Sequence, residues 1–97
     1  SVAIGHSALK LQNPASAANM YNVAVGHGSG SNITTGVQNI LVGGLAGLFA
    51  TTTDGSTFVG AEAGQGITGT KLTGNHNTAI GQKAGLLLQG AAKENTL

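Results

Sequence analysis

The sequence predicts an all-β protein, a repetitive β-roll or β-helix solenoid with about one sequence motif per rung. Two observations lead to this prediction. A nine-residue motif occurs five times, and its apolar residues alternate with a period of two, as in a strand. Motifs begin at residues 1, 22, 39, 56 and 77, so the spacings are 21, 17, 17 and 21 residues. We therefore expect a coil of 17 residues, with four extra residues looped out of the first and last intervals.

The second and fourth positions of every motif are β-branched, which is typical of a strand. The second-position residues are Val2, Val23, Ile40, Thr57 and Thr78, and the fourth-position residues are Ile4, Val25, Val42, Val59 and Ile80. Residues two apart lie on the same face of an extended chain. We expect these two positions to face the core, with the third position on the outside.

The residues that flank each strand also repeat. The fifth position is always glycine, which suits a bend or a close approach of another backbone; these residues are Gly5, Gly26, Gly43, Gly60 and Gly81. The first position is Asn or Ser. We expect Asn22, Asn39 and Asn77 to form a structural ladder, because stacked amides can hydrogen-bond along a β-stack.

Two longer connections interrupt the 17-residue frame. They run from Leu9 to Tyr21, which contains the only proline, Pro14, and from Gln65 to His76. Turn residues such as Thr, Gly, Asn and Asp fill the other intervals. Residues 32–34 and 70–73 are candidates for a second short strand in the coil.

Composition indicates that such a solenoid needs neighbours. The chain has 97 residues with 17 Gly, three aromatic residues and no Cys, so disulfides cannot supplement a small core. The third-position residues are never charged; they are Ala3, Ala24, Leu41, Phe58 and Ala79. We expect this outer face to pack against other chains. Residues 1–97 form a single repetitive segment, which we expect to be a piece of a longer protein.

Charge and residue types exclude several function classes. Four Lys, three acidic residues and a net charge of +1 do not form the basic patch that nucleic acid requires. No apolar run is long enough for membrane insertion. The only acidic residues, Asp54, Glu62 and Glu94, make a poor catalytic pair, so we expect no enzyme activity, no catalytic residues and no cofactor.

Three residues are candidate surface ligand contacts: Tyr21 and His76, which each precede a motif Asn after a longer connection, and Lys71 within the second connection. The alternative for the two rings is that they only cover the end of a rung. His6 and His27 share the first variable motif position and should lie near each other. We expect no metal site there, because ligand sets need more convergent donors.

The motif Asn-Thr-Ala-Ile-Gly-x-x-Ala-Gly at residues 77–85, with its Thr-Gly spacers, resembles the repeats of bacteriophage tail fibres. The Ser-Val-Ala-Ile-Gly run at residues 1–5 is more distantly similar to the heads of trimeric autotransporter adhesins. This resemblance, from residue 1 to about residue 86, implies a homotrimer that binds a glycan or outer-membrane receptor on a bacterium. It places the protein in a virion tail fibre or, alternatively, at a bacterial cell surface.

Two other functions stay open at this point. One is a purely structural fibre spacer, which would be favoured if the longer connections form no cleft. The other, more distant, is an ice-binding solenoid. It is disfavoured because most of the threonines lie in turns, out of register with one another.

Overall fold

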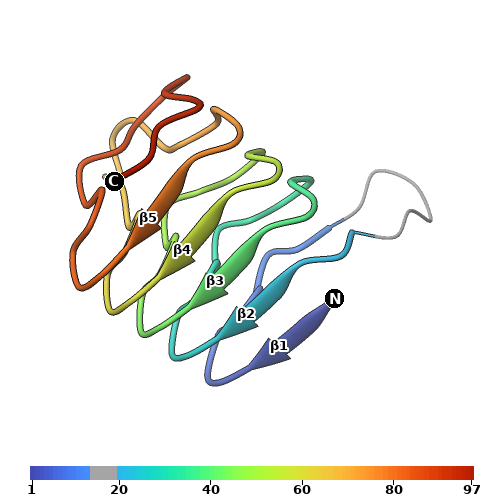
Figure 1. Cartoon of the computed structure of the whole chain (residues 1–97). Helices are drawn as coiled ribbons and strands as arrows, with labels where there is room; N and C mark the ends of the chain where they lie inside the picture. Colours follow the sequence, from blue (N-terminus) through green and yellow to red (C-terminus); the bar gives the residue numbers. More distant parts are fainter. Residues whose placement is uncertain (14–19) are drawn as a thin grey trace.

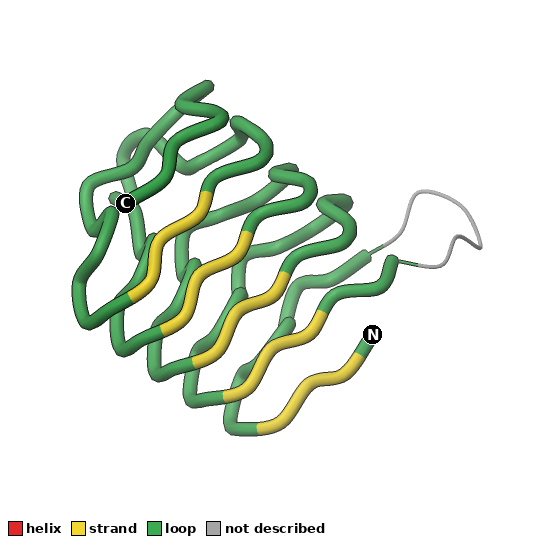
Figure 2. The backbone as a smooth tube through the Cα atoms, in the orientation of Figure 1, coloured by secondary structure: helices red, strands yellow, loops and turns green. Residues whose placement is uncertain are grey.

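Five short parallel strands form one sheet in the computed structural model, which describes residues 1–13 and 20–97 (Figure 1). The strands are β1 (Val2–Ile4), β2 (Val23–Val25), β3 (Ile40–Val42), β4 (Thr57–Val59) and β5 (Thr78–Ile80). They stack in sequence order, and the backbone between them winds round as turns and loops (Figure 2). The predicted all-β solenoid, with one motif per rung, is confirmed.

Every strand pairs with the next one in motif register. Ala24, for example, lies opposite Ala3 in β1 and opposite Leu41 in β3. The inter-rung hydrogen bonds continue beyond the strands: the Gly28 amide donates to the His6 carbonyl at 2.8 Å, and the Leu45 amide donates to the His27 carbonyl at 2.8 Å. Equivalent motif positions are therefore stacked in columns along the whole solenoid.

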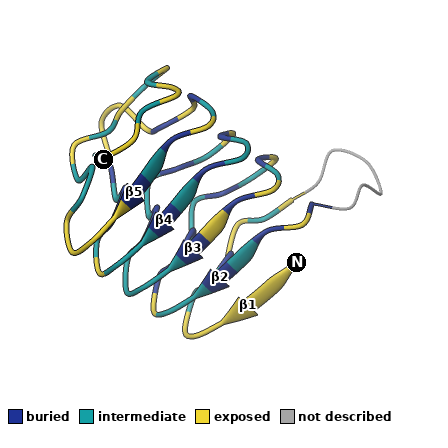
Figure 3. Ribbon diagram, viewed as in Figure 1, coloured by how far each residue is buried: buried dark blue, intermediate teal, exposed yellow. Residues whose placement is uncertain are grey.

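The expected orientation of the strands is wrong. The third position faces the core: Leu41 and Phe58 are fully buried, whereas Ile4 and Ile80, in the fourth position, are 59% and 62% exposed. Figure 3 shows this alternation along β2 to β5, while β1, at the end of the stack, is exposed throughout. A period of two decides which residues share a face, but it does not say which face is inside.

The residues of the interior explain why the third-position side chains, and not those of the second and fourth positions, face the core. Apolar residues from the opposite wall of the coil, including Ile33, Ala46 and Ala63, pack against the third-position side chains in one narrow core. A Cβ added to Gly64 would lie 2.5 Å from the Phe58 ring, so the large ring occupies the space that a side chain at residue 64 would need. The ninth position is Leu9 in the first motif and glycine in the other four, and a Cβ at Gly30 would lie 2.5 Å from Leu41 Cδ1 of the next rung. The glycine column therefore leaves the space that the larger third-position side chains, Leu41 and Phe58, occupy.

The glycines that close β1 to β4 are required by two features, a positive φ and the close approach of the next rung, whereas Gly81 has only the positive φ of +121°. Gly26 has φ +129°, and a Cβ there would lie 2.6 Å from the Gly43 carbonyl carbon on the next rung. Both the bend and the close approach of another backbone that the sequence predicted are present.

The solenoid continues into a sixth rung that sequence analysis missed. Thr96 forms a parallel bridge with Thr78, and the Thr78 amide donates to the Asn95 carbonyl at 2.7 Å. Asn95-Thr96 repeats Asn77-Thr78, but only three residues of that motif are present, too few to recognise as a copy.

The structure describes all of the second longer connection and only part of the first. In the second, Leu72 is buried and forms single parallel bridges with Ala50 and Gly90, and no second strand per coil forms among the described residues. Residues 68–70 are exposed beside it. Residues 14–19 of the first connection, including the predicted loop proline Pro14, lie outside the described residues.

Candidate functional surface

The most distinctive surface is the outward side of the sheet, here called the β-branched face. Its members are the second- and fourth-position residues Val2, Ile4, Val23, Val25, Ile40, Val42, Thr57, Val59, Thr78 and Ile80. None is charged, and Val2, Ile40 and Ile80 are 50%, 44% and 62% exposed. Given strand geometry, the two columns lie about 7 Å apart and extend for about 20 Å along the stack. The result is a flat, uncharged strip.

The rigidity of this face follows from its chemistry. Each outward side chain is β-branched and has few χ1 alternatives. The strands that carry it are held by short inter-rung bonds, such as Gly43 N to Val25 O at 2.7 Å and Gly60 N to Val42 O at 2.7 Å. A partner that packs here would therefore lose little conformational entropy in the face itself.

A ladder of buried asparagine side chains lies at the position that directly precedes each of β2, β3 and β5. The Asn39 side-chain nitrogen donates to Asn22 Oδ1 at 3.1 Å and to the Thr53 carbonyl at 2.8 Å, while Asn39 Oδ1 accepts from the Ser56 amide at 2.9 Å. Asn77 makes the same kind of contact with the Ala92 carbonyl, at 2.7 Å. All three asparagines are fully buried, so these side chains connect rungs and do not contact solvent.

The ladder extends beyond the three asparagines that the sequence singled out. Ser1 and Ser56 supply hydroxyls at the same motif position, and Asn95 donates to Asn77 Oδ1 at 3.0 Å. Among the described residues, no buried polar side-chain atom lacks a hydrogen-bond partner. The polar interior is therefore fully paired.

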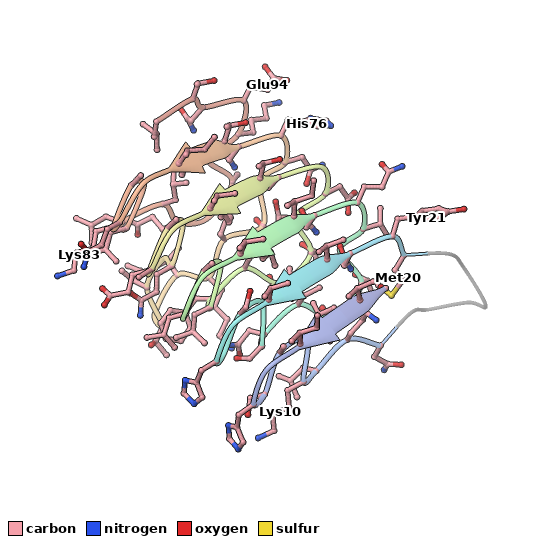
Figure 4. The ribbon with its side chains drawn as sticks, turned by 60° about the horizontal axis from the view of Figure 1, so that its bottom comes forward. Lys10, Met20, Tyr21, His76, Lys83 and Glu94 are labelled. Carbon is pink, nitrogen blue, oxygen red and sulfur yellow. The ribbon has the colours of Figure 1, made fainter. Side chains whose placement is uncertain are left out.

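Tyr21 and His76 belong to one exposed column, here called the corner ridge: Tyr21, Gln38, Gly55, His76 and Glu94. All five have positive φ, and Tyr21 is 63% exposed. Figure 4 shows Tyr21, His76 and Glu94 along one side of the stack, away from Lys83. Tyr21 and His76 are three rungs apart, about 14 Å, so one small ligand would not bridge them.

The other candidate residues lie elsewhere. Lys71 is exposed, and its Nζ donates to Asn32 Oδ1 at 3.4 Å, two rungs back along the stack. Asp54 Oδ1 accepts from the Val37 amide at 2.8 Å, which gives that carboxylate a turn-stabilising role. His6 and His27 do lie together, with ring centroids 5.3 Å apart.

The described residues contain no pocket, and they bring no three His, Cys, Asp or Glu side chains together. A helix long and apolar enough to cross a membrane is also absent from the described part of the chain. Comparison of the chain with protein-family models, with curated proteins and with solved structures gives no match. Function must therefore be argued from the surfaces.

Sequence reasoning missed the β-branched face because it assigned those residues to the core. The eighth and ninth motif positions fit the observed orientation once the opposite wall is known. The ninth motif position is glycine in four of five copies and the eighth is Ala or Ser. Glycine at the ninth position leaves space in the coil for one inward column, which third-position side chains such as Leu41 and Phe58 occupy, whereas two inward β-branched columns would need more room.

Proposed function

We propose that this chain is a rigid segment of a bacteriophage tail fibre, in which three copies pack through their β-branched faces and present the fibre to a bacterial surface. One observation supports this best. The outward positions are β-branched in all five motifs, whereas the inward third position varies from Ala to Phe. Side chains that face only water tolerate variation, so the uniformity outside argues for a packed environment there.

Energetics favour covering this face. Isoleucines such as Ile4, Ile40 and Ile80 are about half exposed, and burying the remainder stabilises an assembly by roughly 1 kcal/mol each. The face has no charge that would need a partner. Lateral packing also leaves the ends of each coil free to stack further rungs.

The two-column shape of the face fits a trimer. Each chain offers one column of second-position residues and one of fourth-position residues. Around a threefold axis parallel to the stack, one column packs toward each neighbour, and equivalent rungs of three chains lie at the same level. The bacterial adhesin head remains the alternative setting for such a trimer, at a cell surface instead of a virion.

Receptor binding in this proposal belongs to surfaces outside the trimer contact. Tyr21 and His76 on the corner ridge, and Lys71 beside the second connection, are the candidate contacts to a surface glycan or outer-membrane receptor. A purely structural spacer is the second candidate. The absence of a pocket among the described residues favours it, because a shaft needs no cleft.

The test is the solution mass of the native chain, measured by light scattering and sedimentation before and after mild heating. We expect three chain masses that survive heating. Val42→Lys places a charge at the centre of the β-branched face and should give monomers, since burial of an unpaired ammonium is costly. Thr73→Lys, at an exposed position outside that face, is the matched control and should remain trimeric.

A wild-type chain that is monomeric at every concentration would contradict the trimer. A thermal-hysteresis assay on that monomer would then test the ice-binding alternative. That alternative would rest on the β-branched face, where Thr57 and Thr78 are in register.

A further inference from the structure

His6 and His27 occupy one motif position on neighbouring rungs, and their side chains lie against each other. The ring centroids are 5.3 Å apart, the ring planes differ by 12°, and both residues are exposed. From this pair, and against the expectation from the sequence, we propose a binding site for one divalent transition-metal ion of the Cu²⁺, Ni²⁺ or Zn²⁺ type, held by one imidazole nitrogen from each rung. Both ligands come from one chain, so the site does not depend on the proposed trimer.

The backbone places the two histidines with little freedom. The Gly26 amide donates to the Ile4 carbonyl at 2.7 Å and the Gly28 amide donates to the His6 carbonyl at 2.8 Å, so inter-rung bonds flank His27 on both sides. The two Cα atoms are therefore held at the spacing of paired strands, about 4.8 Å. A metal ion would find its ligands already gathered, which lowers the entropic cost of chelation.

Ser7 gives His6 the hydrogen bond that a metal-binding imidazole needs. Its hydroxyl oxygen lies 3.2 Å from His6 Nδ1. With the proton on Nδ1, the ring donates to Ser7 Oγ and leaves the Nε2 lone pair free for a metal. Such outer contacts fix the tautomer and orientation of metal-binding histidines.

Space for a hydrated ion exists beside the pair. The next residue in the column is Gly44, and no atom lies within 4 Å of the position that a Cβ would occupy there. Two nitrogens bound to one ion at 2.0–2.1 Å are about 3 Å apart, so the rings must tilt toward each other. Exposed side chains can make that change by rotation about χ1 and χ2. Water would complete the coordination, since imidazole suits Cu, Ni and Zn and the donor set is open.

The test is a calorimetric titration of the untagged chain with Cu²⁺, the ion that such nitrogen sites bind most tightly. We expect one ion per chain. His6→Ala and His27→Ala should each weaken binding by on the order of 100-fold, because each removes one arm of the chelate. His76→Ala is the matched control, a lone exposed histidine on another corner, and should leave the affinity unchanged.

A gain-of-function variant sharpens the test. Gly44→His adds a third imidazole to the column at a position with open space and should tighten Cu²⁺ binding by roughly tenfold or more. Circular dichroism of every variant should match the wild type, since none of these side chains is in the core. The proposal is overturned if the double variant His6→Ala/His27→Ala binds Cu²⁺ as tightly as the wild type. It is equally overturned if His76→Ala loses as much affinity as the single variants.

Discussion

The two sides of the sheet follow different rules. Inside, the third motif position ranges from Ala24 to Phe58, and glycines such as Gly47 and Gly64 on the opposite wall make room for the larger residues. Outside, both columns are β-branched in every rung. Variation inside is possible because the glycine column leaves room for small and large third-position side chains alike. Uniformity outside has no such explanation within the chain, which is why we look to other copies.

The largest effect should separate these two sides. Phe58→Ala empties the centre of the core and should lower the free energy of unfolding by about 3–5 kcal/mol at every chain concentration. Val59→Ala, the adjacent outward residue, should cost about 1 kcal/mol or less in dilute chains. Its cost should grow when chains are concentrated enough to assemble. Denaturant titrations at low and high chain concentration measure both changes.

Equal, concentration-independent losses for these two variants would mean that the β-branched face contributes to the single coil alone. The distinction between the two sides would then carry no information about assembly.

A smaller effect should come from the polar part of the interior. Asn39→Ala removes the amide that contacts Asn22 Oδ1 and the Thr53 carbonyl, and leaves the buried Ser56 amide without its acceptor. We expect a loss of about 2–4 kcal/mol in the free energy of unfolding. Asn75→Ala removes one half-buried acceptor for the Asp54 amide and should cost about 1 kcal/mol. Thermal or chemical denaturation measures the loss of stability in both variants. Similar losses would show that the buried ladder contributes no more to stability than a half-buried hydrogen bond.

The smallest effect concerns the corner ridge. Gln38 is exposed with φ +60°, a conformation that glycine adopts without strain, so Gln38→Gly should raise the free energy of unfolding by up to about 1 kcal/mol. Gly55→Ala in the same column should lower it, because Gly55 has φ +63°, where a Cβ is strained, and the Cβ would also displace the exposed His76 ring 2.8 Å away. A denaturant titration of both variants is sufficient. A loss of stability in Gln38→Gly would mean that the glutamine side chain makes a contribution that outweighs its backbone strain.

Much of the architecture could be predicted from the repeats. Motif spacing located β1 to β5, and the strand-closing glycines indicated both the bend and the close approach seen between Gly26 and Gly43. The shared motif position of His6 and His27 also predicted that they lie side by side. The sixth rung at Asn95 escaped because three residues make too short a copy to recognise. Of the candidate contacts, Tyr21 and His76 share a column, whereas the contact of Lys71 with Asn32 depends on a loop whose path the repeat does not specify.

The amino-acid sequence by itself determined the repeat period, the strand in each rung and the columns into which residues fall, because these follow from local backbone preferences and from equal spacing. Only the tertiary structure decided which side of each strand faces inward. A period of two is symmetric between the two faces, and the choice depends on what the opposite wall of the coil supplies. Here that wall carries Ala63, Gly64 and their equivalents, and the space they leave is filled by third-position side chains such as Phe58. The β-branched residues are thereby turned outward.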